Sequence, residues 1–226
     1  MSRLNAFVTG TDTEVGKTAI SCALLHAAAA RGLRTAAVKP LAAGCDAEGH
    51  NEDALALQAA MTEELPYAQV NPVALAPSVA PHIAARQAGK RLQVGRLAGL
   101  CRGVTSGPAD FVLIEGAGGW RVPVNERETL ADLARELGFG VILVVGMRLG
   151  CINHALLTAE AIRRDGLPLL GWVANQVGEP MACHAENVDT LRRWLPAPLL
   201  GEVPRLTPFD PKKASDLLDL SLIYGM

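Results

Sequence analysis

The chain has 226 residues, which is enough for one α/β domain with a substantial core across residues 1–226. Its 21 basic and 23 acidic residues are nearly balanced, so the composition predicts no polybasic surface for nucleic acid or anionic lipid. The longest apolar runs, such as VILVV at 141–145, are far shorter than the roughly 20 residues that cross a bilayer. We therefore expect small-molecule partners, and neither a nucleic acid nor a membrane.

The five cysteines are scattered along the chain without a C-x-x-C pair. This pattern fits neither a disulfide framework nor a zinc site, because both need paired or regularly spaced thiols. It is typical of a protein in a reduced cytoplasm, and we expect a cytoplasmic location.

The first predicted element is a buried strand, LNAFVTG at 4–10, followed by a glycine loop and an Ala- and Leu-rich helix over 17–31. The loop and helix start read GTDTEVGKT, in which Gly10 and Gly16 lie one residue further apart than in the common phosphate-binding loop. A helix start still concentrates free N–H groups and partial positive charge, which suits a phosphate. Lys17 would then reach the outer phosphates and the hydroxyl of Thr18 would coordinate Mg²⁺. An ordinary strand-to-helix turn would explain neither the G-K-T at the helix start nor the opening strand.

Short apolar runs alternate with helical patterns through the rest of the chain, and runs without polar alternation are typical of strands buried on both faces. The predicted strands are 34–40, 109–116, 140–146, 168–175 and 197–204. The predicted helices after the first are 53–62, 91–103, 129–137, 152–165, 184–195 and a possible one at 212–220. This order predicts a doubly wound, mainly parallel α/β fold of the P-loop NTPase kind. The segment around Pro66 to Pro81, within 63–90, is predicted to be a long functional loop.

Ligands bind such folds at the carboxyl ends of the strands, and the residues that end these strands are unusually polar. Lys39 ends the second strand, and Glu115 ends the run DFVLIE just before a glycine turn. A carboxylate beside a triphosphate site is a natural Mg²⁺ ligand, and Asp53 is its candidate partner. Two lysines at one phosphate site favour a second anionic reactant, because fixed cations stabilise charge that develops in a transition state.

Two of these residues also have simpler interpretations. Asp53 stands at the start of a predicted helix, where a carboxylate interacts well with the helix dipole without any metal. Asn175 ends the run GWVAN, where its amide could read an adenine edge or simply form part of a turn. Both interpretations are compatible with each position.

Seven stretches in this order and spacing closely resemble the dethiobiotin synthetases, from about residue 5 to residue 206. They are GTDTEVGKT, KPLAAG at 39–44, EDALAL at 52–57, EGAGGW at 115–120, LGCINHALLTAEAI at 149–162, GWVANQV at 171–177 and PAPLLGEVP at 196–204. The resemblance implies an ATP-dependent cyclo-ligase of biotin synthesis. Such enzymes convert 7,8-diaminononanoate, CO2 and ATP into dethiobiotin, ADP and phosphate, through a carbamate that ATP phosphorylates and the second amine then attacks.

The resemblance also implies roles for individual residues. Lys39 and Lys17 would be catalytic, and Mg²⁺ would be held by Thr18, Asp53 and Glu115. The nucleotide would contact Glu14, Val15, Gly16, Lys17, Thr18, Glu115, Gly116, Ala117, Gly118, Asn175, Gln176, Pro204, Arg205 and Leu206. The substrate would contact Thr13, Lys39 and Ala43, and its carboxylate would meet Leu149, Gly150, Cys151, Ile152 and Asn153 of a second subunit in a homodimer.

Two departures from the family pattern bear on these roles. Ala43 stands where many relatives place a hydroxyl residue, so one hydrogen bond to the substrate would be missing or replaced by backbone or water. After Leu206 the sequence TPFDPKKASDLLDL diverges, and no nucleotide contact is assigned there.

Three other functions use a similar core. A ParA- or MinD-like ATPase switch would need a DNA or membrane surface, which the composition does not predict. An amidotransferase-type cobyrinate synthetase would need a further glutaminase domain, for which 226 residues leave no room. A nucleotide-binding module without catalysis is the simplest alternative.

Overall fold

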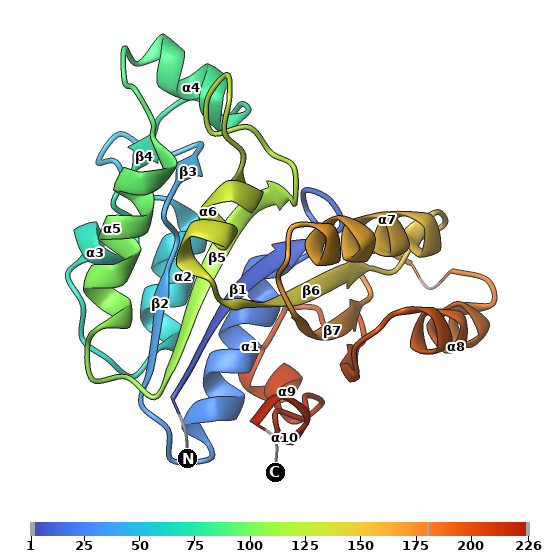
Figure 1. Cartoon of the computed structure of the whole chain (residues 1–226). Helices are drawn as coiled ribbons and strands as arrows, with labels where there is room; N and C mark the ends of the chain where they lie inside the picture. The colour runs from blue at the N-terminus through green and yellow to red at the C-terminus, as the bar shows by residue number, and fades with distance from the viewer. Residues whose placement is uncertain (1–2, 180, 225–226) are drawn as a thin grey trace.

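A sheet of six parallel strands forms the centre of the computed structural model, which describes residues 3–179 and 181–224 (Figure 1). The strands lie in the order β2-β5-β1-β6-β7-β8. Their bounds are Leu4–Gly10 (β1), Thr35–Val38 (β2), Phe111–Gly119 (β5), Gly140–Gly146 (β6), Leu169–Asn175 (β7) and Leu199–Val203 (β8). The predicted fold class is confirmed, and every predicted strand is present.

Helices cover both faces of this sheet, as the unbroken apolar runs require. Helices α1 (Lys17–Ala29) and α2 (Glu52–Ala60) pack together, and α9 (Pro211–Ser215) packs on α1. Helices α6 (Leu130–Leu137) and α7 (Cys151–Arg164) cross the side that faces the viewer in Figure 1, where α5 (Val94–Thr105) packs on α6. Helix α8 (His184–Trp194) lies beside α7, and α10 (Ser221–Tyr224) follows α9.

The alternation of side chains along β6 divides the core into two clusters. Ile142 and Val144 join the main cluster, whereas Leu143 and Val145 face a second cluster built from β7, α7 and α8. Trp172 of β7 is completely buried in this second cluster. Strand β6 is therefore buried on both faces, which explains why its sequence lacks polar alternation.

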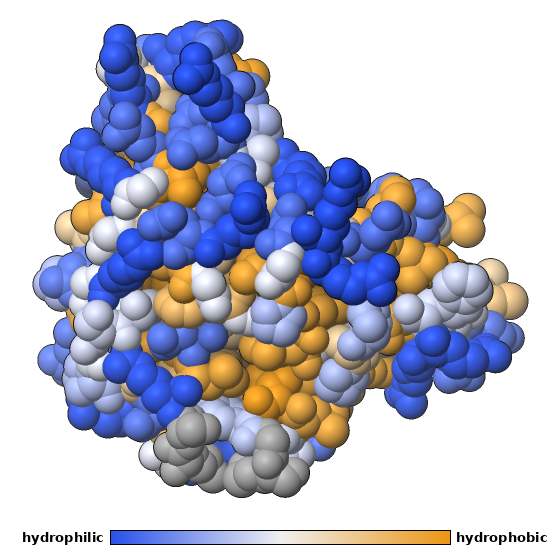
Figure 2. Space-filling view, viewed as in Figure 1, coloured by the Kyte–Doolittle hydropathy of each residue, from blue (hydrophilic) through white to orange (hydrophobic). Residues whose placement is uncertain are grey.

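The segment predicted as a long loop contains short elements instead. Helices α3 (Tyr67–Val70) and α4 (Pro81–Gln87) form there, and β4 (Ala74–Leu75) pairs with β3 (Ala42–Ala43) in a second, two-stranded sheet. In Figure 1, β3, β4 and α4 form a projecting region beyond the carboxyl ends of the central strands, and Figure 2 shows a largely hydrophilic surface there. The sequence predicted a long functional loop here without giving its conformation, because elements of two to seven residues carry no recognisable periodicity.

Two other predicted boundaries are corrected. Strand β5 continues through Gly119, so the glycines after Glu115 extend the strand and do not form a turn there. The possible helix at 212–220 is a single turn, α9, separated from α10 by turn residues. Within residues 3–179 and 181–224, no helix is both long and apolar enough to cross a membrane.

Candidate active site

The loop between β1 and α1, residues 11–16, has the backbone shape of an anion site, and we call it the phosphate loop. Gly16 precedes α1 with φ of 83°, in the left-handed region that favours glycine. A Cβ at this position would lie 2.2 Å from Nδ2 of Asn175, so a side chain is excluded by space as well. Glu14 also has positive φ, at 59°. The first N–H groups of α1 lack helical partners and are available to a bound oxyanion.

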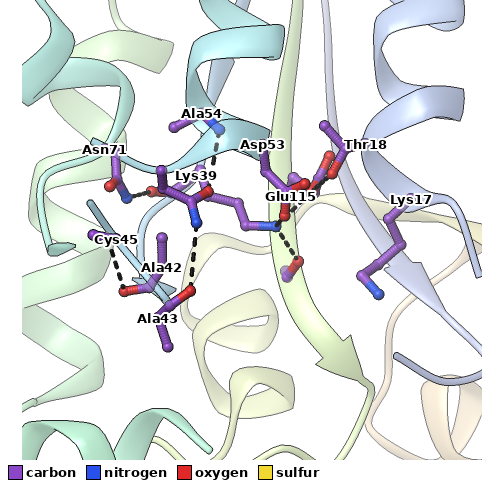
Figure 3. A network of polar contacts seen from close by, with 12 residues as sticks. Lys17, Thr18, Lys39, Ala42, Ala43, Cys45, Asp53, Ala54, Asn71 and Glu115 are labelled. Atoms are coloured by element: carbon purple, nitrogen blue, oxygen red, sulfur yellow. Dashed lines mark hydrogen bonds and ion pairs between the residues drawn. The ribbon is translucent and has the colours of Figure 1, made fainter. Parts of the chain in front are cut away.

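Lys39, which follows β2, forms the centre of a polar cluster with Glu115 of β5 and Asp53 of α2 (Figure 3), in which Lys39 and Glu115 are buried and Asp53 is partly exposed. Its Nζ donates to Oδ2 of Asp53 at 2.8 Å and to Oε1 of Glu115 at 2.6 Å. Burial would lower the pKa of the Lys39 ammonium, but the Glu115 and Asp53 carboxylates outweigh burial and raise it. Lys39 is therefore a permanently charged group that neutralises two carboxylates from different elements.

Glu115 and Asp53 offer hard oxygen ligands beside the phosphate loop. Thr18 Oγ1 donates to Glu115 Oε1 at 2.7 Å, which brings the hydroxyl at the start of α1 to the same carboxylate. Oε2 of Glu115 is fully buried and has no hydrogen-bond partner among the described residues. Burial would raise the pKa of the Asp53 carboxyl, but the Lys39 charge and hydrogen bonds from Lys39 and Thr18 lower it. An unsatisfied oxygen, an ionised carboxylate and a hydroxyl fit Mg²⁺, which takes few protein ligands and completes its shell with phosphate and water.

Lys17 stands apart from this cluster in Figure 3. Its Nζ donates to the backbone oxygen of Asp12 at 3.1 Å, and its side chain is buried. Burial, followed by the nearby Lys39 charge, lowers the pKa of Lys17 to about 8. Lys17 and Lys39 are close enough for the charge of Lys39 to lower the pKa of Lys17. Two such neighbouring cations become favourable when a ligand brings further negative charge into the site.

A cavity of about 700 Å³ opens between the phosphate loop, the Lys39 cluster and the projecting region. The predicted site residues that line it are Thr13, Glu14, Gly16, Lys17, Thr18, Lys39, Ala43, Asp53, Ala117 and Gly118. Glu115 and Gly116 are buried behind it. The other lining residues were not predicted from the sequence and are Ala19, Ala42, Asn51, Ser78, Val79, Ala80, Pro81 and Val122. The only sequence signal for residues 78–81 is their position in a Pro-containing segment after a strand-end lysine.

The residues predicted to surround the nucleotide base lie elsewhere. Asn175 ends β7, and its Nδ2 donates to the backbone oxygen of Val15 at 2.9 Å. Gln176 Nε2 donates to the backbone oxygen of Glu179 at 2.9 Å. Pro204, Arg205 and Leu206 follow β8, and Pro204 and Arg205 are exposed. None of these residues lines the 700 Å³ cavity.

The residues predicted to meet the substrate carboxylate lie at the start of α7. Gly150 precedes the helix with φ of 95°, and Leu149 is 93% exposed. Cys151 is buried, Ile152 is partly buried and Asn153 is exposed. None of these five residues lines the cavity of its own chain.

Comparison with known proteins identifies the family. A family model described as an AAA domain matches residues 5–213. An ATP-dependent dethiobiotin synthetase from Cellvibrio japonicus is 56% identical over 224 residues, which cover 98% of each chain. The chain belongs to the dethiobiotin synthetase family. A second dethiobiotin synthetase, from Marinobacter nauticus, is 57% identical over 210 residues and covers 91% of this chain and 90% of its own.

Solved structures extend the comparison at the level of the fold. The MinC:MinD complex of Aquifex aeolicus aligns with a TM-score of 0.57 at 14% identity, covering 93% of this chain and 86% of the matched chain. A ParA family ATPase from Chlorobium tepidum aligns with a TM-score of 0.53 at 12% identity, covering 98% and 92%. At such low identity these proteins share only the fold with the dethiobiotin synthetase family. The predictions of a dethiobiotin synthetase and of an ATP-dependent ligase are therefore confirmed, and the switch is a distant relation.

Proposed function

We propose that this chain closes the ureido ring of dethiobiotin, using 7,8-diaminononanoate, CO2 and ATP and releasing ADP and phosphate. One amine nitrogen attacks CO2 and loses a proton, giving a carbamate. A carbamate oxygen attacks the γ-phosphorus of ATP and expels ADP, giving a carbamic-phosphoric anhydride. The second amine attacks the carbonyl carbon, loses a proton and expels phosphate. The observation that carries this proposal is the buried Lys39 cluster beside the phosphate loop.

The two lysines act on different charges in this proposal. Lys17, at the start of α1, stabilises the outer phosphate oxygens of ATP. Lys39 and Lys17 both line the cavity and stabilise the carbamate and the phosphoryl group as charge spreads over its oxygens. Phosphate oxygens near Lys17 favour its charged form, which opposes the lowering of its pKa by burial.

Mg²⁺ is the proposed metal, held by Thr18, Asp53 and Glu115. When bound, it neutralises charge on the β- and γ-phosphates and helps to orient them. Lys39 binds Oδ2 of Asp53 and Oε1 of Glu115 in this structure, so Mg²⁺ would share both carboxylates with the lysine, and Oε2 of Glu115 is the oxygen without a partner among the described residues.

ATP is proposed to lie along the phosphate loop, with Glu14 to Thr18 around the phosphates. Gly116, Ala117 and Gly118 border the nucleotide, and Ala117 and Gly118 already line the cavity. Asn175 and Gln176 at the end of β7, together with Pro204, Arg205 and Leu206 after β8, are proposed to surround the base.

The diamine is proposed to bind at Thr13, Lys39 and Ala43, with its carboxylate at residues 149–153 of a second copy in a homodimer. Two observations support this arrangement. Leu149 is 93% exposed, and residues 149–153 do not line the cavity of their own chain. A helix start such as that of α7 can bind a carboxylate through its free N–H groups.

The remaining proposals concern the whole chain. Residues 1–226 are proposed to act as one catalytic domain in the cytoplasm. The five cysteines are free, as expected in a reducing compartment.

The decisive experiment measures ADP release from MgATP in four mixtures that contain or lack 7,8-diaminononanoate and bicarbonate. We expect release only when both are present, with a product one carbonyl heavier than the diamine by mass spectrometry. ADP release that ignores both additions, or no release in any mixture, would contradict the proposed reaction.

A further inference from the structure

Lys39 follows an edge strand, so its backbone polar groups need partners outside the sheet. Strand β2 is the first strand in the sheet order, and its outer edge faces no other strand of the sheet among the described residues. The Lys39 N–H donates instead to the Val70 oxygen at 2.7 Å, and the Lys39 oxygen accepts from Nδ2 of Asn71, also at 2.7 Å. Residues 70 and 71 therefore hold both backbone polar groups of the residue that carries the central cation of the site.

Asn71, which follows α3, is buried, and both ends of its amide are hydrogen-bonded. Its Nδ2 donates to the Lys39 oxygen and, at 3.4 Å, to the Val73 oxygen. Its Oδ1 accepts from the hydroxyl of Tyr67 at 3.1 Å. Both N–H donors of the amide are thus used within the chain, and Figure 3 shows this amide against the backbone of Lys39. These bonds fix the orientation of the Asn71 side chain.

The Tyr67 hydroxyl connects this amide to the start of α2. It accepts from the N–H of Asn51 at 2.7 Å, and the side chain of Asn51 caps α2. Asp53, which accepts from Lys39 Nζ at 2.8 Å, lies in the first turn of the same helix. A continuous chain of hydrogen bonds therefore joins the start of α2 to the backbone of Lys39.

The two ends of this chain carry side chains that meet in the site. Glu115, the other partner of Lys39, is part of the sheet, whereas Asp53 is on a helix outside the sheet and is 46% exposed. The distance between Lys39 and Asp53 therefore depends on how α2 is attached to the end of β2. Tyr67 makes this attachment next to the residues concerned.

We propose that Tyr67 and Asn71 are positioning residues for Lys39, because they fix its backbone relative to the start of α2. They keep the Lys39 ammonium in contact with Asp53 at the wall of the cavity. Neither Tyr67 nor Asn71 lines that cavity, so each acts through Lys39 without touching a ligand. This inference rests on the proposed catalytic function of Lys39. Its distinguishing consequence is that the effect of either residue on kcat depends on the presence of the lysine.

The test measures kcat for dethiobiotin formation and the Kd for MgATP in Tyr67→Phe, which removes the hydroxyl and keeps the ring. We expect kcat to fall about fivefold, corresponding to one lost hydrogen bond, while the Kd for MgATP changes by less than ~2-fold. Asn71→Leu, which has a similar shape and lacks the amide, should lower kcat further. In a Lys39→Gln background, Tyr67→Phe should lower kcat by less than ~2-fold, because the lysine through which it acts is absent.

Two outcomes would overturn the proposal. Unchanged kcat in Tyr67→Phe would show that the hydroxyl does not position Lys39. An equal loss of kcat in the original chain and in the Lys39→Gln background would show that Tyr67 affects the reaction independently of the lysine, as a merely structural residue would. Tyr67→Phe keeps the proposal testable if Asn71→Leu fails to fold, because it changes a single hydroxyl.

Two control variants remove comparable groups elsewhere. Tyr224→Phe removes a hydroxyl that has no hydrogen-bond partner among residues 3–179 and 181–224. Gln58→Leu removes the bond from Gln58 Nε2 to the Leu65 oxygen at 2.8 Å, which attaches a later turn of α2 to the segment that leads into α3. Both controls should keep the kcat of the original chain. A loss in Gln58→Leu as large as that in Tyr67→Phe would contradict the proposal, because any loosening of α2 would then slow the reaction.

Hydrogen exchange tests the same contact without any reaction. The Asn51 amide loses its acceptor in Tyr67→Phe, so its exchange measured by NMR should be at least ~5-fold faster than in the original chain, whereas Tyr224→Phe should leave it unchanged. Unchanged exchange in Tyr67→Phe would contradict the connection between Tyr67 and α2. Failure of the proposed reaction is therefore distinguishable from failure of this inference.

Discussion

The pKa values of two buried lysines in this site shift in opposite directions because their neighbours differ. Lys39 contacts two carboxylates, which outweigh burial and raise its pKa, whereas burial, followed by the charge of Lys39, lowers the pKa of Lys17 to about 8. The charge of Lys39 therefore stabilises the nucleotide-free protein. The charge of Lys17 lowers the free energy of unfolding, and bound phosphate would offset this loss.

The first prediction concerns the charge of Lys39. In Lys39→Gln, kcat for dethiobiotin formation should fall by at least ~100-fold, since a fixed cation is used mainly in the transition state. The Kd for MgATP, measured by calorimetry, should change by less than ~10-fold. A variant with normal kcat would falsify the catalytic role.

A second prediction concerns Lys17 and pH. The unfolded chain keeps the ordinary lysine pKa of 10.5, while the folded protein has a pKa of about 8, so the unfolded state binds more protons between these values. The free energy of unfolding should therefore rise with pH across this interval, with the full cost present below pH 8. In the nucleotide-free state, Lys17→Met should be about 3 kcal/mol more stable than the original chain at pH 7, and this advantage should shrink by pH 10.

Urea unfolding at pH 7 and pH 10 measures this difference. Lys213→Met, at an exposed position on α9, is the control and should leave stability unchanged. A Lys17→Met protein less stable than the original chain at pH 7 would show that burial of the ammonium is fully compensated.

Sequence analysis predicted some site residues and missed others for a common reason. Lys39 and Glu115 were recognisable because each is a charged residue at the end of an apolar run, although β5 continues through Gly119 and only Lys39 stands at a strand end. The ion pair of Asp12 with Arg148 and the bond of Asn175 to Val15 join residues 136 and 160 positions apart. Such pairs depend on which strands become neighbours, and no local pattern records that.

At the scale of elements, long strands and helices were predictable and short ones were not. Each central strand is a run of apolar residues that must be buried on both faces of the sheet. The lack of polar alternation in such a run can be recognised from the sequence. Strands β3 and β4 depend on backbone hydrogen bonds between two segments that are distant in the sequence. Examples are the bonds from Gly44 N to Pro77 O and from Cys45 N to Leu75 O. These bonds place Ser78 and its neighbours on the cavity. The role of the projecting region in lining the cavity therefore could not be predicted from the sequence.

A third prediction concerns the start of α6, where Thr129 and Asp132 form a reciprocal capping box. Thr129→Ala should lower the free energy of unfolding by about 1 kcal/mol, because the capping box loses the hydrogen bond that Thr129 Oγ1 donates to Asp132 Oδ2 at 2.8 Å. Thr190→Ala in the middle of α8, where the hydroxyl bonds only the Glu186 oxygen, is the control and should be nearly neutral. Chemical denaturation measures the free energy of unfolding of both variants. Equal decreases in the two variants would contradict the capping role of Thr129.

At the scale of the whole molecule, exposed leucines lie on α7 and just before its start. Leu149 is 93% exposed and Leu157 is 58% exposed, and Figure 2 shows apolar side chains over this end of the molecule. These side chains favour the proposed homodimer, because burial of apolar surface drives such association.

The fourth prediction is that Leu157→Glu converts the homodimer into a folded monomer in sedimentation experiments. Its kcat/KM for the diamine should fall at least ~10-fold, while MgATP binding is retained, because in the proposed homodimer the second copy would supply residues 149–153. Leu100→Glu on α5, 41% exposed in the original chain, is the control and should remain dimeric. A fully active Leu157→Glu monomer would rule out the shared site.

The order of the strands has a consequence for protein synthesis. Strand β1 is the first strand to be synthesised, but its two neighbours in the sheet are β5 and β6. Leu4 therefore cannot pair until Phe111 has been synthesised, and Ala6 cannot pair on its other side until Gly140 has been synthesised. Until then both edges of an apolar strand have no native partner on the ribosome, where they are open to wrong pairing. We expect nascent chains that end before residue 111 to need a chaperone, and the phosphate loop to take its final shape only after β6 has emerged.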